Sequence, residues 1–418
     1  MPPVCYNTNM KISGIKLRLD EEENKLYDIA KKKFGRDGFF RILKKSLDAR
    51  DKGNIFYVCS VEISGEPFVS PSEFIGEYCY PENPVAVVGF GPAGIFCALR
   101  LARAGFRPII IERGQDADER KKTVNRFFTS RELDTECNIQ YGEGGAGAFS
   151  DGKLNTGVRS EYKDYVLSEL IKHGAPEEIA YSAKPHIGSD ILPGVVKAIR
   201  EEITDCGGKF LFNTAVVDIE TEGEQLKSLK VKKRDYTEKI EVSAAVFAIG
   251  HSSRDTYEML FAKGIAMEAK DCAVGFRIEH LQEDINKAQF GRDIGVTADY
   301  KLTSSVCDRG VFTFCMCPGG TVVPAASEEN ALVTNGMSEY KRDKTNANSA
   351  VVCQVKTSDY GSRPLDGIDY LRSIEKRAFV AGGGDYSAPV QNVADFMRQK
   401  KRFFRKGKAF LLFGNKIL

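Results

Sequence analysis

The sequence predicts an α/β protein built around a mainly parallel sheet, with a small βαββ domain in front of it. From residue 84 onward, short apolar segments alternate with helix-like segments, which is typical of a parallel sheet. The first 80 residues instead contain one helix-like segment among three strand-like segments. A stretch with four prolines, residues 65–84, separates the two patterns and indicates a linker.

The N-terminal domain, residues 1–80, is predicted from its periodicity. Residues 11–19 alternate apolar and polar side chains, as a half-buried strand does. The acids at positions 20–23 favour a helix start, and that helix should end near Gly35. Residues 39–49 and 55–63 then predict two strands joined by a turn.

The following segments predict a second domain, residues 84–270, and a third, residues 271–397. The expected strands of the second domain cover residues 85–88, 108–111, 209–219, 228–231 and 242–249, and its helices cover 95–104, 165–173 and 192–206. Strands and turns dominate after about residue 273, with strands at 311–316 and 321–325 and a helix at 367–377. Residues 398–418 are expected to form a basic tail, solvated or in contact with an anionic surface.

A glycine-rich turn, Gly-Phe-Gly-Pro-Ala-Gly at residues 89–94, joins the first strand of the second domain to its helix. Gly89 suits a tight turn, Gly91 lets backbone approach a pyrophosphate, and Gly94 lets the helix pack close to the strand. Glu112 follows the next strand, where a carboxylate accepts hydrogen bonds from ribose hydroxyls and disfavours a 2′-phosphate. The combination predicts a Rossmann-like dinucleotide-binding domain rather than a structural turn, and leaves FAD and NAD both open.

A second glycine-rich segment covers residues 142–153. Successive glycines let N–H groups surround an anion or let backbone lie flat against a ring. Ser150, Asp151 and Lys153 add a hydroxyl, a carboxylate and a cation. The alternative is a flexible surface loop, but a second such loop favours a flavin over a simple NAD site.

Composition excludes several classes of function. Sixty Lys and Arg residues against 58 Asp and Glu give no electrostatic basis for binding nucleic acid or a membrane. The eleven cysteines and four histidines show no metal-ligand spacing, so we expect no metal. No signal peptide or apolar span is apparent, and we expect a cytoplasmic protein.

Several motifs together resemble the bacterial FAD-dependent dehydrogenases of largely unassigned function, within the glutathione-reductase-like flavoprotein superfamily. The similar segments include GFGPAGIFCALRLARAG, YGEGGAGAFSDGKLNTG, AIGHSSRDT, VGFRIEH, RGVFTFCMCPGGTVV and GGGDYSAPVQNVADF. The residues after Phe396 do not look like the family's continuation, which suggests that the motif closing the flavin pocket is missing. Residues 381–385 resemble that motif only superficially.

The resemblance implies an FAD-binding domain with a three-layer ββα Rossmann-like arrangement. It also implies an inserted mixed α+β domain that covers the flavin ring and the substrate. The residues expected to contact FAD are Gly89, Gly91, Pro92, Ala93, Gly94, Glu112, Arg113, Gly144, Gly145, Ser150, Asp151, Lys153, Val217 and Gly250. Among them, Arg113 is expected near the adenine, together with Val216 and Val217. The resemblance further implies an oxidoreductase acting on a small organic substrate, with NAD(P)H as a second electron partner.

Other interpretations remain open on the sequence. An NAD-dependent dehydrogenase or a shortened flavin-fold protein without catalysis would share the same turn, and the oligomeric state, the substrate and the catalytic residues are not predicted. Cys315 and Cys317 suit a redox pair or two buried small residues. His251 suits acid–base work or a helix-start turn. Arg277 and His280 suit a substrate space or an ion pair with Glu279 or Glu283.

Overall fold

Two compact units make up the described part of the protein. The computed structural model describes residues 9–69, 78–158, 160, 162–234, 236–399 and, for the backbone alone, 410–416. The small unit takes its residues from 1–76, 153–187 and 283–298. The large unit takes its residues from 77–152, 188–282 and 299–418. Each unit is described by itself.

The small unit contains the expected βαββ arrangement. Its antiparallel sheet has the order β1-β3-β2, from β1 (Asn9–Arg18), β2 (Phe39–Asp48) and β3 (Phe56–Ser64). Helix α1 (Asn24–Phe34) packs its buried Leu26 and Ala30 into one core with Leu17, Val61 and Ile63. Gly35 ends the helix in the left-handed conformation, with φ of 81°.

Two later segments complete the small unit, which the division at residues 80 and 84 does not anticipate. One carries α4 (Tyr162–Lys172) and η2 (Glu177–Ala180), and the other carries most of α7 (Gln282–Phe290). The Lys45 N–H donates to the Tyr181 carbonyl oxygen at 2.8 Å, and the Ala183 N–H donates to the Lys45 carbonyl oxygen at 2.9 Å. The outer edge of β2 thereby forms backbone hydrogen bonds with the segment 181–183 at Lys45.

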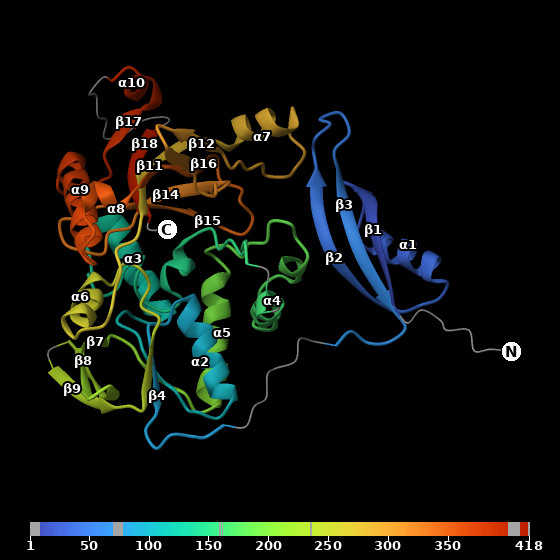
Figure 1. Ribbon diagram of the computed structural model, residues 1–418. Coiled ribbons are helices and arrows are strands. Elements are labelled where there is room, and N and C mark those ends of the chain that lie inside the picture. Colours follow the sequence, from blue (N-terminus) through green and yellow to red (C-terminus); the bar gives the residue numbers. More distant parts are fainter. Residues whose placement is uncertain are drawn as a thin grey trace. The chain divides into compact units, whose positions relative to one another are not determined.

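A four-stranded parallel sheet forms the base of the large unit (Figure 1). Its order is β10-β4-β5-β6, from β10 (Ala244–Phe247), β4 (Val85–Val88), β5 (Ile109–Ile111) and β6 (Lys209–Leu211). All three pairings are parallel, as the alternation of strands and helices predicts.

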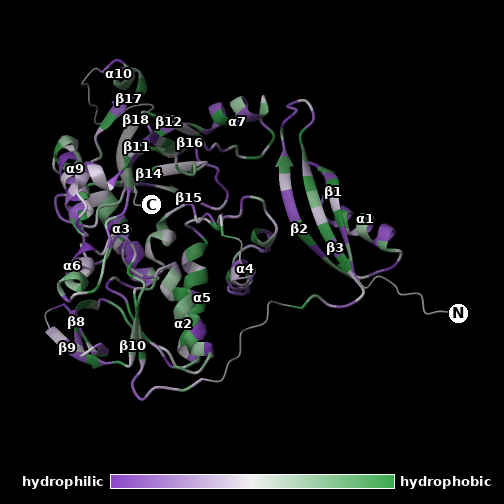
Figure 2. Cartoon of the chain, viewed as in Figure 1, coloured by the Kyte–Doolittle hydropathy of each residue, from purple (hydrophilic) through white to green (hydrophobic). Residues whose placement is uncertain are grey.

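Helices cover one face of this sheet and a second sheet covers the other. Helices α2 (Pro92–Arg103) and α5 (Leu192–Asp205) pack against each other, and both carry hydrophobic stretches (Figure 2). The antiparallel strands β7 (Ala215–Glu222), β8 (Gln225–Lys233) and β9 (Tyr236–Glu241) contribute to one core with Ala86, Val88 and Ile111 of the parallel sheet. The predicted three-layer ββα Rossmann-like arrangement is confirmed.

The rest of the large unit is a mixed α+β region. A six-stranded sheet has the order β12-β13-β16-β11-β18-β17, and β14 pairs with β15. The bounds of these strands are β11 (Cys272–Leu281), β12 (Thr303–Val306), β13 (Arg309–Thr313), β14 (Gly320–Pro324), β15 (Thr334–Ser338), β16 (Asn346–Val355), β17 (Val390–Asn392) and β18 (Phe410–Lys416). The remaining helices of the unit are α3 (Ala117–Ser130), η1 (Gly145–Phe149), α6 (Arg254–Ala262), α8 (Thr357–Tyr360), α9 (Asp366–Gly382) and α10 (Val393–Met397).

Two expectations about these elements are wrong. Residues 209–219 form two strands rather than one, because Asn213 adopts a left-handed conformation with φ of 54° and turns the chain between β6 and β7. The segment expected to be a basic tail contains β18, whose backbone pairs with both β11 and β17.

No helix within the described ranges is long and apolar enough to cross a membrane.

We expect Gly94→Ala to lower the free energy of unfolding by about 1–3 kcal/mol, the usual cost of overpacking. A Cβ atom at Gly94 would lie 1.9 Å from the Gly89 carbonyl oxygen, so the helix and the turn would have to separate. Urea denaturation measures the effect. Gly194→Ala in α5 is the matched control, since a Cβ there meets no atom within 4 Å and a helical alanine is favourable by up to about 1 kcal/mol. Equal stability of the two variants would contradict the packing argument.

Candidate functional site

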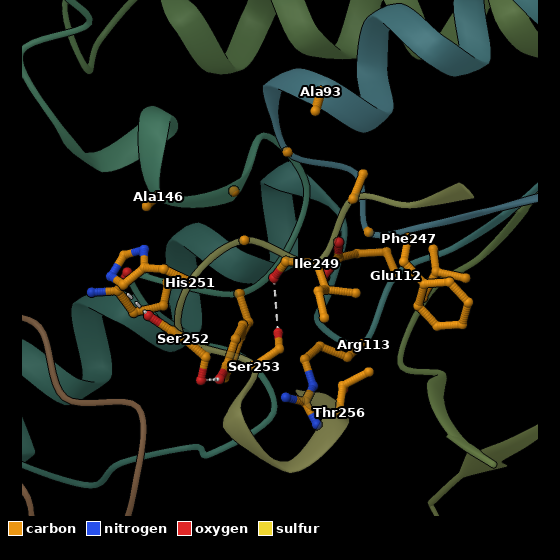
Figure 3. A pocket seen from close by; sticks show the side chains of 18 of the residues that line it. Ala93, Glu112, Arg113, Ala146, Phe247, Ile249, His251, Ser252, Ser253 and Thr256 are labelled. Carbon is orange, nitrogen blue, oxygen red and sulfur yellow. Dashed lines mark hydrogen bonds between the residues drawn. The ribbon is translucent and has the colours of Figure 1, made fainter. Parts of the chain in front are cut away.

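A cavity of about 400 Å³ lies in the large unit where the strands β4, β5 and β10 end. Carboxyl ends of parallel strands are the usual ligand site in open α/β sheets. Figure 3 shows Ala93 and Ala146 on one side of the cavity and His251, Ser252 and Ser253 on the other. Its lining comprises Val88, Gly89, Gly91, Pro92, Ala93, Ile111, Glu112, Arg113, Gln140, Tyr141, Gly145, Ala146, Gly147, Thr214, Ala215, Val216, Phe247, Ala248, Ile249, Gly250, His251, Ser252, Ser253, Thr256 and Tyr257.

The first glycine-rich turn has the geometry that its spacing predicts. Gly89 has φ of 95°, and a Cβ atom there would lie 2.6 Å from the Ala248 carbonyl oxygen. Gly91 is the N-cap residue of α2, and the Ile95 N–H donates to its carbonyl oxygen at 2.9 Å. The first residues of α2 therefore line the cavity, with the positive end of the helix dipole toward it.

The second glycine-rich segment packs directly on the first turn. The Gly144 N–H donates to the Phe90 carbonyl oxygen at 2.9 Å. A Cβ atom at Gly145 would lie 2.9 Å from the Gly91 Cα atom, and Gly145 has φ of 57°. A glycine is thus required at position 145 on this contact, and the residues Gly145, Ala146 and Gly147 of η1 line the cavity.

The Glu112 carboxylate joins three loops at the edge of the cavity. One oxygen accepts from the Phe90 N–H at 2.8 Å, and the other accepts from the N–H groups of Gly114 and Gly142, both at 2.9 Å. The side chain is buried. A carboxylate offers about four lone-pair positions, so three backbone donors leave room for one more hydrogen bond.

Arg120 holds the carbonyl groups of the same loop. Its fully buried guanidinium donates to the carbonyl oxygens of Asn138, Ile139 and Glu143 at 3.0, 3.0 and 2.6 Å, and to that of Gly142 at 3.2 Å. Burial lowers the pKa of Arg120 to about 10, which leaves the side chain cationic at neutral pH. Glu112 and Arg120 therefore stabilise the loop through its N–H and C=O groups respectively.

Arg113 closes another part of the cavity wall. Its guanidinium lies 4.5 Å from the centre of the Tyr141 ring and forms a bidentate pair with Asp255, at 3.1 and 2.5 Å. Burial acts to raise the pKa of Asp255, but the hydrogen bond and the charge of Arg113 outweigh it and lower that pKa. Burial also raises the pKa of Tyr141 to about 12, and its hydroxyl donates to the Ser252 carbonyl oxygen.

Beyond Gly250, the segment from His251 to Tyr257 supplies lining residues that are not among the predicted FAD contacts. Ser253 is the N-cap residue of α6, but its hydroxyl donates to the Ile249 carbonyl oxygen at 2.8 Å rather than to the helix. His251 lies just before this helix start, and its Nε2 is 3.2 Å from the Ser252 hydroxyl. Their position after an apolar strand, β10, is the signal that indicates such lining residues.

A second cavity, of about 230 Å³, adjoins the first and shares Gln140, Ala146, Gly147 and His251 with it. The shared residues form a wall common to both spaces. The other lining residues are Ser150, Arg277, Val333, Thr334, Asn335, Ala350 and Val352, contributed largely by β11, β15 and β16. The mixed α+β region therefore encloses space beside the large cavity.

The structure brings together only some of the residues predicted to contact the cofactor. Those that line the large cavity are Gly89, Gly91, Pro92, Ala93, Glu112, Arg113, Gly145 and Gly250. Ser150 lines the second cavity instead. Val216 lines the large cavity whereas Val217, which is 37% exposed, does not, because neighbouring strand residues face opposite sides.

Four further predicted residues lie outside both linings. Gly94 and Gly144 support the two turns. Asp151 is buried in an ion pair with Arg342, and Lys153 belongs to the small unit.

The hypothesis of a redox-active cysteine pair receives no support from side-chain positions. Cys315 is exposed, Cys317 is buried, and both are free thiols. The described residues contain no cluster of three or more His, Cys, Asp or Glu side chains that could hold a metal ion.

Comparisons with known proteins identify two domain families and one close relative. Residues 271–408 match the family described as FAD-dependent protein, C-terminal domain-like, and residues 9–64 match a domain of unknown function. The first match includes residues 398–408, so the expectation that this segment departs from the family is wrong for those residues. An uncharacterized protein of Clostridium beijerinckii is 46% identical over 420 residues, which cover 94% of this chain and 78% of that protein.

Two solved structures show low overall similarity. One is a flavin-dependent brominase (14% identity, TM-score 0.37, 80% of this chain and 68% of that chain). The other is a geranylgeranyl bacteriochlorophyll reductase-like protein from Thermoplasma acidophilum (10% identity, TM-score 0.35, 80% and 66%). This chain spans about two thirds of the length of each.

We expect Glu112→Gln to loosen all three loops at once. An amide nitrogen in place of one oxygen would face at least one of the N–H groups of Phe90, Gly114 and Gly142, and hydrogen bonds to charged groups contribute about 1.5–3 kcal/mol each. Hydrogen exchange of these three amides measures the effect as faster exchange. Glu136→Gln is the control, because Glu136 is exposed and pairs only with Arg113 at the surface. Unchanged exchange in Glu112→Gln would contradict the assigned role.

Proposed function

This chain belongs to the same family as the uncharacterized Clostridium beijerinckii protein and carries an FAD-dependent-protein C-terminal domain, and on that premise we propose that it is an FAD-dependent oxidoreductase. The observation that carries the proposal is the contact between the two glycine-rich segments at Gly91 and Gly145. Both segments line one cavity at the ends of the parallel strands.

The residues present fit FAD. Gly91, Pro92 and Ala93 at the start of α2 would hold the pyrophosphate, because the backbone there carries no bulky side chain and the helix dipole favours an anion. Glu112 is the only acid among the described lining residues, and its remaining acceptor position suits a ribose hydroxyl. Gly145, Ala146 and Gly147 would lie beside the part of the cofactor nearer to the second cavity.

The reaction proposed is the oxidation or reduction of a small organic substrate. When bound, FAD supplies the redox chemistry. The protein would orient the substrate and exclude water. His251 lines both cavities and is the residue best placed to hold or move a proton near the substrate. NAD(P)H is proposed as the second electron partner.

We expect the purified protein to show flavin absorbance and to release near-stoichiometric FAD on denaturation. Gly91→Ala should lower FAD affinity about 10- to 100-fold, since a methyl group at the pyrophosphate position costs about 1–3 kcal/mol. Its fold should persist, because Gly91 has φ of −82° and its Cβ would lie 3.7 Å from the Gly145 Cα atom, an ordinary contact.

Gly157→Ala serves as the control for this measurement, since a Cβ there meets no atom within 4 Å and Gly157 lines neither cavity. Equal FAD affinity of the two variants would remove Gly91 from the cofactor site. A colourless protein that cannot be reconstituted with FAD would contradict the proposed function itself.

A further inference from the structure

We propose that the second cavity binds a small organic carboxylate through Arg277. As a statement about the substrate, this inference rests on the proposed function, because it assigns the cavity beside the dinucleotide site to the substrate. As a statement about binding, it stands on the side chains of this cavity alone.

Arg277 is a buried cation without a carboxylate partner. It lies in β11 and is 5% exposed. Its Nη1 donates to Asn348 Oδ1 at 2.8 Å and its Nη2 donates to Asn335 Oδ1 at 3.2 Å, both neutral amides. No Asp or Glu within the described ranges forms an ion pair with it, and its Nε has no hydrogen-bond partner there. The expected ion pair with Glu279 or Glu283 is therefore wrong.

A buried cation of this kind lowers the stability of the fold unless another group compensates its charge. Burial lowers the pKa of Arg277, which measures the same penalty on its charged form. Buried charges in proteins are ordinarily paired with an opposite charge or fully hydrogen-bonded. A ligand carboxylate in the cavity that Arg277 lines would supply the missing charge.

A second buried arginine in the same unit shows what a structural role looks like. Arg254 is 7% exposed, about as buried as Arg277. It forms a bidentate pair with Glu375, at 2.9 and 2.7 Å, and bonds Glu328 at 2.6 Å. The fold thus provides carboxylates for Arg254, whereas Arg277 has two amide oxygens and the Cys317 side chain beside it but no carboxylate, although both arginines lie in the large unit.

The rest of the cavity limits the ligand to a small monoanion with an apolar body. Its volume of about 230 Å³ is below the range of about 300–1,000 Å³ common for drug-sized ligands. Arg277 is the only Lys or Arg among its described lining residues, which suits one carboxylate rather than a dianion. Val333, Ala350 and Val352 would contact carbon atoms, and the planar guanidinium fits the planar carboxylate.

Isothermal titration calorimetry on the purified protein, with its FAD content recorded, tests the inference. The probes are 2-methylpropanoate and phenylacetate, each compared with the neutral amide of the same shape. We expect both carboxylates to bind and the amides to bind about 30-fold more weakly or not at all. Arg277→Met should weaken carboxylate binding by about 30-fold or more, the usual effect of removing one partner of a buried charge pair. Arg277→Lys should recover part of the affinity.

Asn348→Asp provides a variant that does not depend on removing a buried side chain. The new carboxylate would lie at the Asn348 Oδ1 position, 2.8 Å from Arg277 Nη1, and would replace an amide nitrogen that has no partner. We expect a higher Tm and at least about 10-fold weaker carboxylate binding, since the charge is already compensated. Arg309→Met is the matched control, because Arg309 pairs with Asp359 and lines neither cavity.

The outcomes separate this inference from the proposed function. A protein that contains FAD but binds neither carboxylate, or binds them equally after Arg277→Met, would overturn the inference and leave the proposed function intact. A protein without FAD that still binds carboxylates through Arg277 would support the binding site and contradict the flavoenzyme proposal.

Discussion

The candidate site depends on one buried carboxylate that holds three separate loops. Glu112 accepts backbone N–H groups from the first glycine-rich turn, from the chain after β5 and from the second glycine-rich segment. Arg120 takes the carbonyl groups of that second segment. The two turns meet where Gly145 has no room for a side chain, so side-chain packing cannot hold them together at that point. The two opposite buried charges of Glu112 and Arg120 thus hold the backbone of these loops in place, and they do so without adding a side chain that would fill the cavity.

The sequence predicts the strand, glycine-rich turn and helix at residues 85–103 well, because the residues that indicate them lie close together in the chain. The strand before Gly89, the helix after it and the acid at position 112 act within a single βαβ unit, so spacing alone indicates their arrangement. The interpretation of Glu112 was less complete. Its three backbone hydrogen bonds come from residues up to 30 positions away from it in the sequence, and no spacing rule indicates them. The ribose role therefore stays a prediction beside a structural role that the structure shows.

Predictions that required long-range information were weaker. Val216 and Val217 are both expected near the adenine, and Val217 is among the predicted FAD contacts. Only Val216 lines the cavity, because the turn at Asn213 sets which residues of β7 face it. Arg277 is expected to pair with Glu279 or Glu283, but neither forms an ion pair with it. Glu279 lies two residues along the same strand and on the same side as Arg277, and Glu283 pairs with Lys287 instead. Lys153 was placed at the cofactor because it follows the glycine-rich segment, although it belongs to the small unit.

The three buried arginines of the large unit show how the fold divides structure from function. Arg120 is satisfied by backbone carbonyls and Arg254 by two carboxylates, so both charges are compensated within the protein. Arg277 contacts two amides and the Cys317 side chain but no carboxylate, and it lines the second cavity. A protein interior with effective dielectric well below that of water makes an uncompensated cation the strongest source of attraction for an anion nearby. The same β11 strand that supports the C-terminal sheet therefore also places the charge that would select the substrate.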